Sequence, residues 1–328
     1  MKIKNILLLF LLIISFNLQA LPKAKITLKV VDELGVPIEG AKAITGFTMP
    51  VKTGWGSRAA GSNGLTDSDG LFSAEGETEP YVGLGAMKEG YYRTQDTYDG
   101  FKEVAGFIGL RKWQPWNPTI ELVLKEIKKP ISLYAYKIRG IELPVLNKFI
   151  GFDLVARDWV VPYGSGTRKD FLFKLEVHQE KSMFEYDATL TLKFSNPSDG
   201  LYAFFDDPKT GSVLRSSHNA PIADYNPEFV LRRKRDTRKL YTPKQREDQN
   251  YFFRIRTETD EKGDVVSALY GKIYGSIGFG GIGYKDVSTA QIGFNYYLNP
   301  KLNDTNLEFD TKKNLFKDLN SMEKVRNP

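Results

Sequence analysis

Apolar residues recur at every second position along much of this chain. Two such runs stand close together, one over residues 171–177 and one over 188–194. Successive side chains of a β-strand point to opposite faces, so this spacing predicts an antiparallel pair of strands with one buried face. We expect that face to hold six large side chains: Phe171, Phe173, Leu175, Leu190, Leu192 and Phe194.

The rest of the chain gives the same kind of signal. Between alternating runs stand turn sequences such as NPSDG at 196–200, and no regular helical repeat interrupts them. The sequence therefore predicts an all-β protein nearly free of long helices. In its second half we expect further strands at 131–141, 251–257, 265–275 and 290–297.

The N-terminal part begins with a strand pattern, since Ile26, Leu28 and Val30 occupy alternate positions before a Gly-x-Pro turn. Further on, the stretch DSDG at 67–70 offers two carboxylates that suit calcium. A complete calcium loop needs six to eight oxygen ligands, and Glu75 comes too early to close one. We therefore predict a tight turn with Gly70 in the left-handed conformation, and no metal site.

Three stretches in this order, VVDELGVPIEGAKA from residue 30, GLTDSDGLFSAEG from 64 and KEGYY from 88, resemble the carboxypeptidase regulatory-like domain. The resemblance covers residues 24–127. It implies a seven-stranded, transthyretin-like or immunoglobulin-like β-sandwich that serves as a non-catalytic accessory module. It carries no catalytic residue over to this chain, because a fold identifies an architecture rather than an activity.

The first 20 residues have the composition of a signal peptide. Lys2 and Lys4 precede an apolar run, and Ala20 is a small residue suited to cleavage. A single membrane anchor is the other interpretation, but the apolar run is shorter than the roughly 20 residues that span a bilayer, and no later segment spans one. We expect export to the periplasm or the extracellular space. The chain has no cysteine, so neither disulfides nor a lipid-bearing cysteine contribute.

Removing that segment leaves enough chain for two cores, since one domain usually takes about 100–200 residues. A charged linker ending at Pro130 separates the two alternating regions. We predict a signal peptide at 1–20, the regulatory-like sandwich at 21–129 and a larger antiparallel β-rich domain at 130–310. The tail, 311–328, forms either a short helix or a mobile end.

Basic residues concentrate in one segment, residues 231–247, which holds eight Lys and Arg against Asp236 and Glu247. One interpretation is a solvated loop. The other is a recruiting surface for an anionic envelope polymer or an acidic glycan, exposed on a loop or hairpin. The candidate ligand-binding residues there are Arg232, Arg233, Arg235 and Arg238. The net charge of the whole chain is only +6, and with export this argues against nucleic acid as a partner.

Two tryptophans, Trp113 and Trp116, lie in the Pro-rich stretch KWQPWNP. Such residues either pack at a domain junction or stack on a ligand such as a sugar ring. A third, Trp159, reads as part of a core or interface by the same argument.

Motifs for catalysis are missing from the sequence. The stretch GFGGIG at 278–283 matches the dinucleotide fingerprint in letters, but a strand-like sequence follows it where that fingerprint needs a helix. The two histidines are forty residues apart, without a zinc motif, and no G-x-S-x-G occurs. We predict no catalytic residue, no metal and no cofactor.

Two classes of function stay open. The first is an exported non-catalytic protein that binds an envelope component, a glycan or a protein partner. The second is a β-sandwich hydrolase acting on polysaccharide, because glycosidase carboxylates have no fixed spacing in sequence. A pair of carboxylates in one pocket would distinguish the second class from the first.

Overall fold

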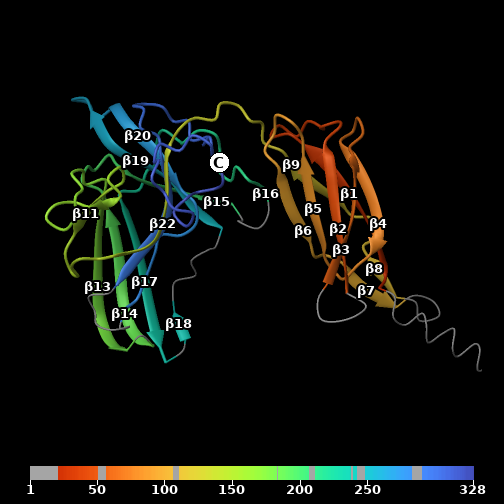
Figure 1. Cartoon of the computed structure of the whole chain (residues 1–328), viewed down its shortest axis with the longest axis horizontal. Helices are drawn as coiled ribbons and strands as arrows, with labels where there is room; N and C mark the ends of the chain where they lie inside the picture. The colour runs from red at the N-terminus through yellow and green to blue at the C-terminus, as the bar shows by residue number, and fades with distance from the viewer. Residues whose placement is uncertain are drawn as a thin grey trace, which may run out of the picture. The chain divides into compact units, whose positions relative to one another are not determined.

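The structure is a computed structural model, and its regular elements are all strands (Figure 1). It describes residues 21–50, 57–105, 111–182, 184–206, 211–237, 239–241, 248–282 and 290–328. The expected signal peptide lies outside these ranges. No helix in the described part of the chain is long and apolar enough to cross a membrane. The all-β prediction is confirmed.

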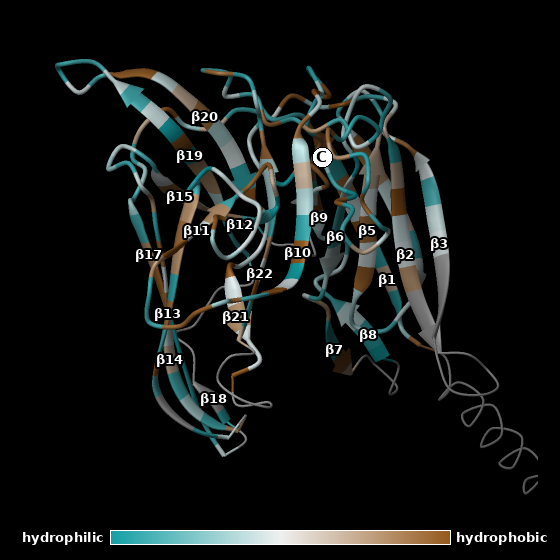
Figure 2. Ribbon diagram, turned by 60° about the vertical axis from the view of Figure 1, so that its left-hand side comes forward, coloured by the Kyte–Doolittle hydropathy of each residue, from teal (hydrophilic) through white to brown (hydrophobic). Residues whose placement is uncertain are grey.

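The chain forms two compact units. Unit 1 contains residues 1–127 together with 209–213, and unit 2 contains 128–208 and 214–328. Polar and apolar residues alternate along the strands of both, which Figure 2 shows as bands of teal and brown. This alternation is what gives each sheet one face for the core and one for solvent.

Unit 1 has two main sheets and a separate hairpin. The first sheet has the order β4-β1-β9, with β1 antiparallel to β4 and parallel to β9, and the second has the order β16-β6-β5-β2-β3. The strands are β1 (Lys23–Val31), β2 (Lys42–Pro50), β3 (Ser57–Leu65), β4 (Leu71–Glu77), β5 (Val82–Met87), β6 (Thr94–Tyr98), β9 (Thr119–Val123) and β16 (Gly211–Ser212), with the hairpin β7 (Lys102–Ala105) and β8 (Arg111–Gln114).

The core of unit 1 follows the predicted alternation. Ile26, Leu28 and Val30 of β1 are fully buried and join one apolar cluster with Val82 and Leu84 of β5. Side chains from two sheets therefore fill one core, as in a β-sandwich.

The DSDG stretch is a turn, as predicted. One oxygen of Asp67, Oδ1, accepts hydrogen bonds from the backbone N–H groups of Asp69 (3.0 Å) and Leu71 (2.8 Å). Gly70 has a φ of 72°, and a Cβ atom there would lie 2.4 Å from the carbonyl oxygen of Val30. Both the backbone conformation and the close approach require glycine. The carboxylate of Asp67 thus holds the turn.

Unit 2 has two antiparallel sheets. The orders are β10-β22-β20-β19-β15, with β21 also paired to β22, and β12-β11-β13-β14-β17-β18. The strands are β10 (Tyr134–Glu142), β11 (Ile150–Asp153), β12 (Asp158–Trp159), β13 (Phe171–Ser182), β14 (Glu185–Lys193), β15 (Gly200–Phe205), β17 (Glu228–Asp236), β18 (Lys239–Tyr241), β19 (Gln249–Thr259), β20 (Val265–Ile273), β21 (Gly278–Gly280) and β22 (Gln291–Leu298).

The predicted buried face of β13 and β14 is confirmed, because all six of its large side chains are buried. The ring of Phe171 lies 5.3 Å from that of Phe253 in β19 and 5.9 Å from that of Phe294 in β22, between ring centroids. Both partners belong to the opposite sheet, so aromatic contacts join the two layers.

The described residues of the GFGGIG stretch are the short strand β21 and a turn at Ile282. They contain no beginning of a helix of the kind that binds a dinucleotide.

Two expectations about local structure need correction. In its described residues, 231–237 and 239–241, the basic segment is not a solvated loop, since β17 and β18 form a hairpin at the edge of a six-stranded sheet. The tail, 311–328, contains no helix and is packed onto unit 2, where Phe316 and Leu319 are buried. Its backbone also bonds to unit 2, because the N–H of Leu315 donates to the carbonyl of Leu133 at 3.0 Å.

Candidate functional site

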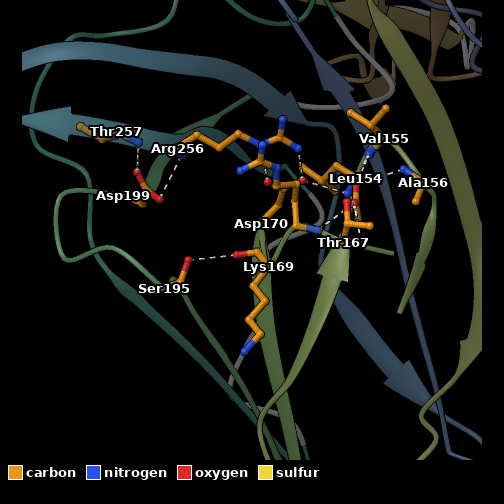
Figure 3. A network of polar contacts seen from close by, with 12 residues as sticks. Leu154, Val155, Ala156, Thr167, Lys169, Asp170, Ser195, Asp199, Arg256 and Thr257 are labelled. Atoms are coloured by element: carbon orange, nitrogen blue, oxygen red, sulfur yellow. Dashed lines mark hydrogen bonds and ion pairs between the residues drawn. The ribbon is translucent and has the colours of Figure 1, made fainter. Parts of the chain in front are cut away.

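Unit 2 contains buried carboxylates, the kind of group that a hydrolase would use, and Figure 3 shows two of them, Asp170 and Asp199. Asp170 is bound by the guanidinium of Arg256 through two bonds, Nε to Oδ1 at 2.8 Å and Nη2 to Oδ2 at 3.0 Å. Asp199 accepts the backbone N–H groups of Arg256 (3.1 Å) and Thr257 (2.9 Å). Burial raises the pKa of both carboxyl groups, against the opposing effect of these donors.

Asp153 has the same structural role nearby. It accepts backbone N–H groups of four residues, namely Val155, Ala156, Thr167 and Arg168. Burial acts to raise the pKa of Asp153, but the four donors together outweigh it and lower the pKa. These carboxylates hold loops in place. The described residues also contain no group of three or more His, Cys, Asp or Glu placed to hold a metal.

The two candidate tryptophans are in different environments. Trp113 is buried, its ring packs 6.3 Å from Phe101, and its Nε1–H donates to the carbonyl of Thr78 at 3.0 Å. Trp116 is 49% exposed. The structure therefore assigns Trp113 to the core of unit 1, whereas Trp116 is open to solvent. Trp159 is buried against Phe152 and Phe173, in the core of unit 2 as expected.

The candidate arginines of β17 are largely engaged by the protein itself. Arg232 binds Asp187 through Nε (2.9 Å) and Nη2 (2.6 Å). Arg233 is half-buried, donates to the carbonyl of Phe279 and lies 5.1 Å from the centre of that ring. Burial lowers the pKa of Arg233. Arg235 is half-buried and lies 4.9 Å from the centre of the Phe184 ring. Arg238 lies outside the described residues.

A different set of cations surrounds an open hollow in unit 2. The hollow has a volume of about 410 Å³ and lies between β10, β22 and the C-terminal residues 321–327. We call this hollow the basic groove, because five basic side chains line it: Lys137, Arg139, Arg215, Lys324 and Arg326. No Asp or Glu is among its lining residues.

The pairing of these cations differs from that in β17. Arg215 binds Asp206, with Nε 3.2 Å from Oδ2. Within the described part of the chain, Lys137, Arg139, Lys324 and Arg326 form no ion pair. Several cations around one hollow raise the local concentration of anions. The basic groove thus has the electrostatic character of an anion-binding site.

Hydrogen bonds to the rest of unit 2 hold the C-terminal side of the groove in place. The backbone N–H of Lys137 donates to the carbonyl of Glu323 at 3.0 Å, which joins the C-terminal segment to the edge of β10. The hydroxyl of Tyr297 donates to the carbonyl of Asn327 (3.0 Å), and that of Tyr274 donates to a main-chain oxygen of Pro328 (3.2 Å). These bonds fix the segment that carries Lys324 and Arg326.

Behind Tyr274 lies a buried polar cluster. The ammonium of Lys272 is 2.9 Å from the Tyr274 hydroxyl and 3.3 Å from the Ser216 hydroxyl, and it lies 4.8 Å from the centre of the Tyr297 ring. Burial raises the pKa of Tyr274 to about 12, so this phenol stays neutral and donates a hydrogen bond at neutral pH. The cluster holds Tyr274, one of the residues that line the hollow, in place.

Sequence reasoning missed the basic groove. Part of the signal was present, because the tail, 311–328, holds five basic residues against Asp318 and Glu323. Lys137 and Arg139, however, are two cations in an ordinary strand, and nothing local indicates that they lie beside the tail.

Comparisons with known proteins add three solved structures. No family model matches the chain, and no curated protein matches it. The 3-chlorocatechol 1,2-dioxygenase of Rhodococcus opacus is 9% identical over 33% of this chain and 62% of its own, with a TM-score of 0.26. A Bacteroides uniformis protein described as carbohydrate-binding is 12% identical over 86% of this chain and 99% of its own, with a TM-score of 0.20.

The third is BcpA, the major pilin subunit of Bacillus cereus. It is 11% identical over 85% of this chain and 96% of its own, with a TM-score of 0.22. At these scores the three likenesses carry no argument about function.

Proposed function

We propose that the chain is an exported, non-catalytic binding protein whose unit 2 binds an acidic envelope component in the basic groove. The observation that carries this proposal is the group of four unpaired cations around one hollow, Lys137, Arg139, Lys324 and Arg326. In the same proposal, unit 1 is a module of the carboxypeptidase regulatory-like type that supports or positions unit 2. A hydrolase gains no support, because Asp153, Asp170 and Asp199 hold the protein's own loops.

Binding to a uronic acid polymer tests the proposal. The protein without residues 1–20 is titrated with polygalacturonate at rising NaCl concentration, and affinity is expected to fall steeply with salt because the contacts are exposed charges. Replacing Arg139→Glu and Lys324→Glu together is expected to weaken binding by at least about tenfold, since two attractions become repulsions.

The matched control is the double variant Lys169→Glu and Lys262→Glu. Both lysines are exposed on unit 2 and line none of the hollows described for it. This variant carries the same change of net charge, so it separates the groove from overall charge. Equal loss in both double variants would contradict the proposal.

A further inference from the structure

The hollow of the basic groove has three neighbours in unit 2. We define them by their linings: the tail hollow (about 420 Å³, with Lys312 and Lys317), the edge hollow (about 360 Å³, with Arg157 and Asn320) and the glycine hollow (about 280 Å³, with Arg233 and Gly280). Within this series, the hollow of the basic groove is called the central hollow.

Shared residues connect the four hollows in one order. The tail hollow shares Lys324 and Arg326 with the central hollow. The central hollow shares Lys137 and Arg139 with the edge hollow, and the edge hollow shares Arg139 and Gly140 with the glycine hollow. A ligand lying along the C-terminal segment and β10 therefore passes from one hollow to the next without leaving the lining.

Cations line every member of this series. The tail hollow adds Lys312 and Lys317, the edge hollow adds Arg157, and the glycine hollow adds Arg233. Glu323, in the edge hollow, is the only carboxylate among the residues that line the four. One small anion contacts a single hollow, whereas repeated charges along a chain match the whole series.

Two of these arginines are held in fixed positions. Arg157 lies 4.8 Å from the centre of the Phe316 ring and 5.4 Å from that of Tyr136, and it pairs with Asp318 at 2.7 Å. Arg233 is held by Phe279, as described above. Fixed guanidinium groups lose little side-chain entropy when a ligand binds, which favours affinity.

Neutral polar side chains also occur in each hollow, and they bear on the kind of polymer. They include Asn295, Ser321 and Asn327 in the central hollow, Asn320 in the edge hollow, Gln291 and Ser276 in the glycine hollow, and Thr311 and Asn314 in the tail hollow. Amides and hydroxyls both donate and accept hydrogen bonds, which suits the hydroxyl groups of a sugar. Polyphosphate offers acceptors alone.

The geometry points to a linear acidic polysaccharide, bound along the four hollows, as the ligand of unit 2. We propose this as a deepening of the proposed function, on which it rests. The tail hollow and the glycine hollow are then the two end subsites. The central hollow, with its four unpaired cations, and the edge hollow lie between them.

Chain length is the direct test. Oligogalacturonates of defined length are titrated into the protein, and affinity is expected to rise with each added unit until the hollows are filled, then to level off. Affinity that is the same for short and long oligomers overturns the four-hollow site and leaves the proposed function standing. No binding of any oligomer overturns both.

Two variants, one at each end of the series of hollows, test where the ligand lies. Gly280→Phe fills the glycine hollow, and it is expected to be tolerated because nothing lies within 4 Å of a Cβ there. Lys312→Glu places a negative charge in the tail hollow. Each is expected to lower affinity for long oligomers by roughly tenfold and to leave the shortest binding oligomer unchanged.

Matched controls stand beside both variants. Gly280→Ala adds one methyl group and leaves the hollow open, and Lys313→Glu changes the neighbouring lysine, which pairs with Asp310 and lines no hollow described here. Both are expected to bind as the unaltered protein does. Equal losses in variant and control overturn the assignment of that end.

The kind of polymer is tested by competition. Tighter binding of polyphosphate or of a single-stranded oligonucleotide with the same number of charges overturns the assignment to a polysaccharide.

Discussion

The hairpin of β17 and β18 and the basic groove both gather Lys and Arg, yet they hold charge in opposite ways. In the hairpin the cations are consecutive in sequence, and β-strand geometry sends them alternately to the two faces of the sheet. Arg232 then meets Asp187, while Arg233 turns toward the core side and covers Phe279. In the groove the cations come from distant segments and converge on one hollow. A run of basic residues in the sequence therefore says little about the electrostatic field outside a protein. The face of the sheet to which each side chain points must also be known.

The largest expected difference is in ligand affinity. Removing three groove charges, with Arg139→Ala, Lys324→Ala and Arg326→Ala, is expected to weaken binding of polygalacturonate about 30-fold, or about 2 kcal/mol. The matched hairpin triple, Arg232→Ala, Lys234→Ala and Lys239→Ala, is expected to change it less than about twofold. Isothermal titration at low salt measures both. A larger loss in the hairpin triple would reverse the comparison.

A smaller difference is expected in stability. Arg233→Glu places a carboxylate against the Phe279 ring and carbonyl in a half-buried position, so we expect the free energy of unfolding to fall by about 1.5 kcal/mol. Arg139→Glu lies on an exposed part of the groove and is expected to change it by less than about 0.5 kcal/mol. Urea unfolding of the two single variants provides the measurement. Indistinguishable midpoints would mean that Arg233 contributes no packing.

The smallest effect is a pH dependence in the hairpin. The bonds from Arg232 lower the pKa of Asp187, so the folded state binds this proton less readily than the unfolded state. The stabilisation is therefore present above the unfolded pKa, about 3.9, and is lost as pH falls through the lower folded pKa. Asp187→Asn is expected to be slightly less stable than the unaltered protein at pH 7, and this difference is expected to shrink as pH falls below the unfolded pKa. A difference that stays constant as pH falls would point to packing instead of charge.

The sequence predicted most of the fold because the relevant signal is local. Phe171, Phe173 and their four companions alternate within two short runs, and each run alone shows which face is buried. Asp67 and Gly70 likewise define their turn within four residues. These features need no knowledge of what lies across the sheet.

The candidate site could not be predicted in the same way. Lys137 and Lys324 are far apart in sequence, and only the pairing of β10 with the C-terminal segment brings them together. The arginines of β17 were found from their density, but their partners Asp187 and Phe279 belong to other strands. Trp113 and Trp116 are three positions apart, and their different burial depends on contacts with Thr78 and Phe101.

The short strand β16 has a consequence for how this chain is made. Unit 1 takes its edge strand from residues 211–212, which pair with Gln95 and Thr94 of β6. During synthesis, more than a hundred residues must follow β6 before that partner exists. Until then β6 presents unpaired backbone groups, a template to which another nascent chain can add a strand. A gene fragment cut after residue 127 keeps that edge open permanently, so an expression experiment on unit 1 alone should include a way of covering it.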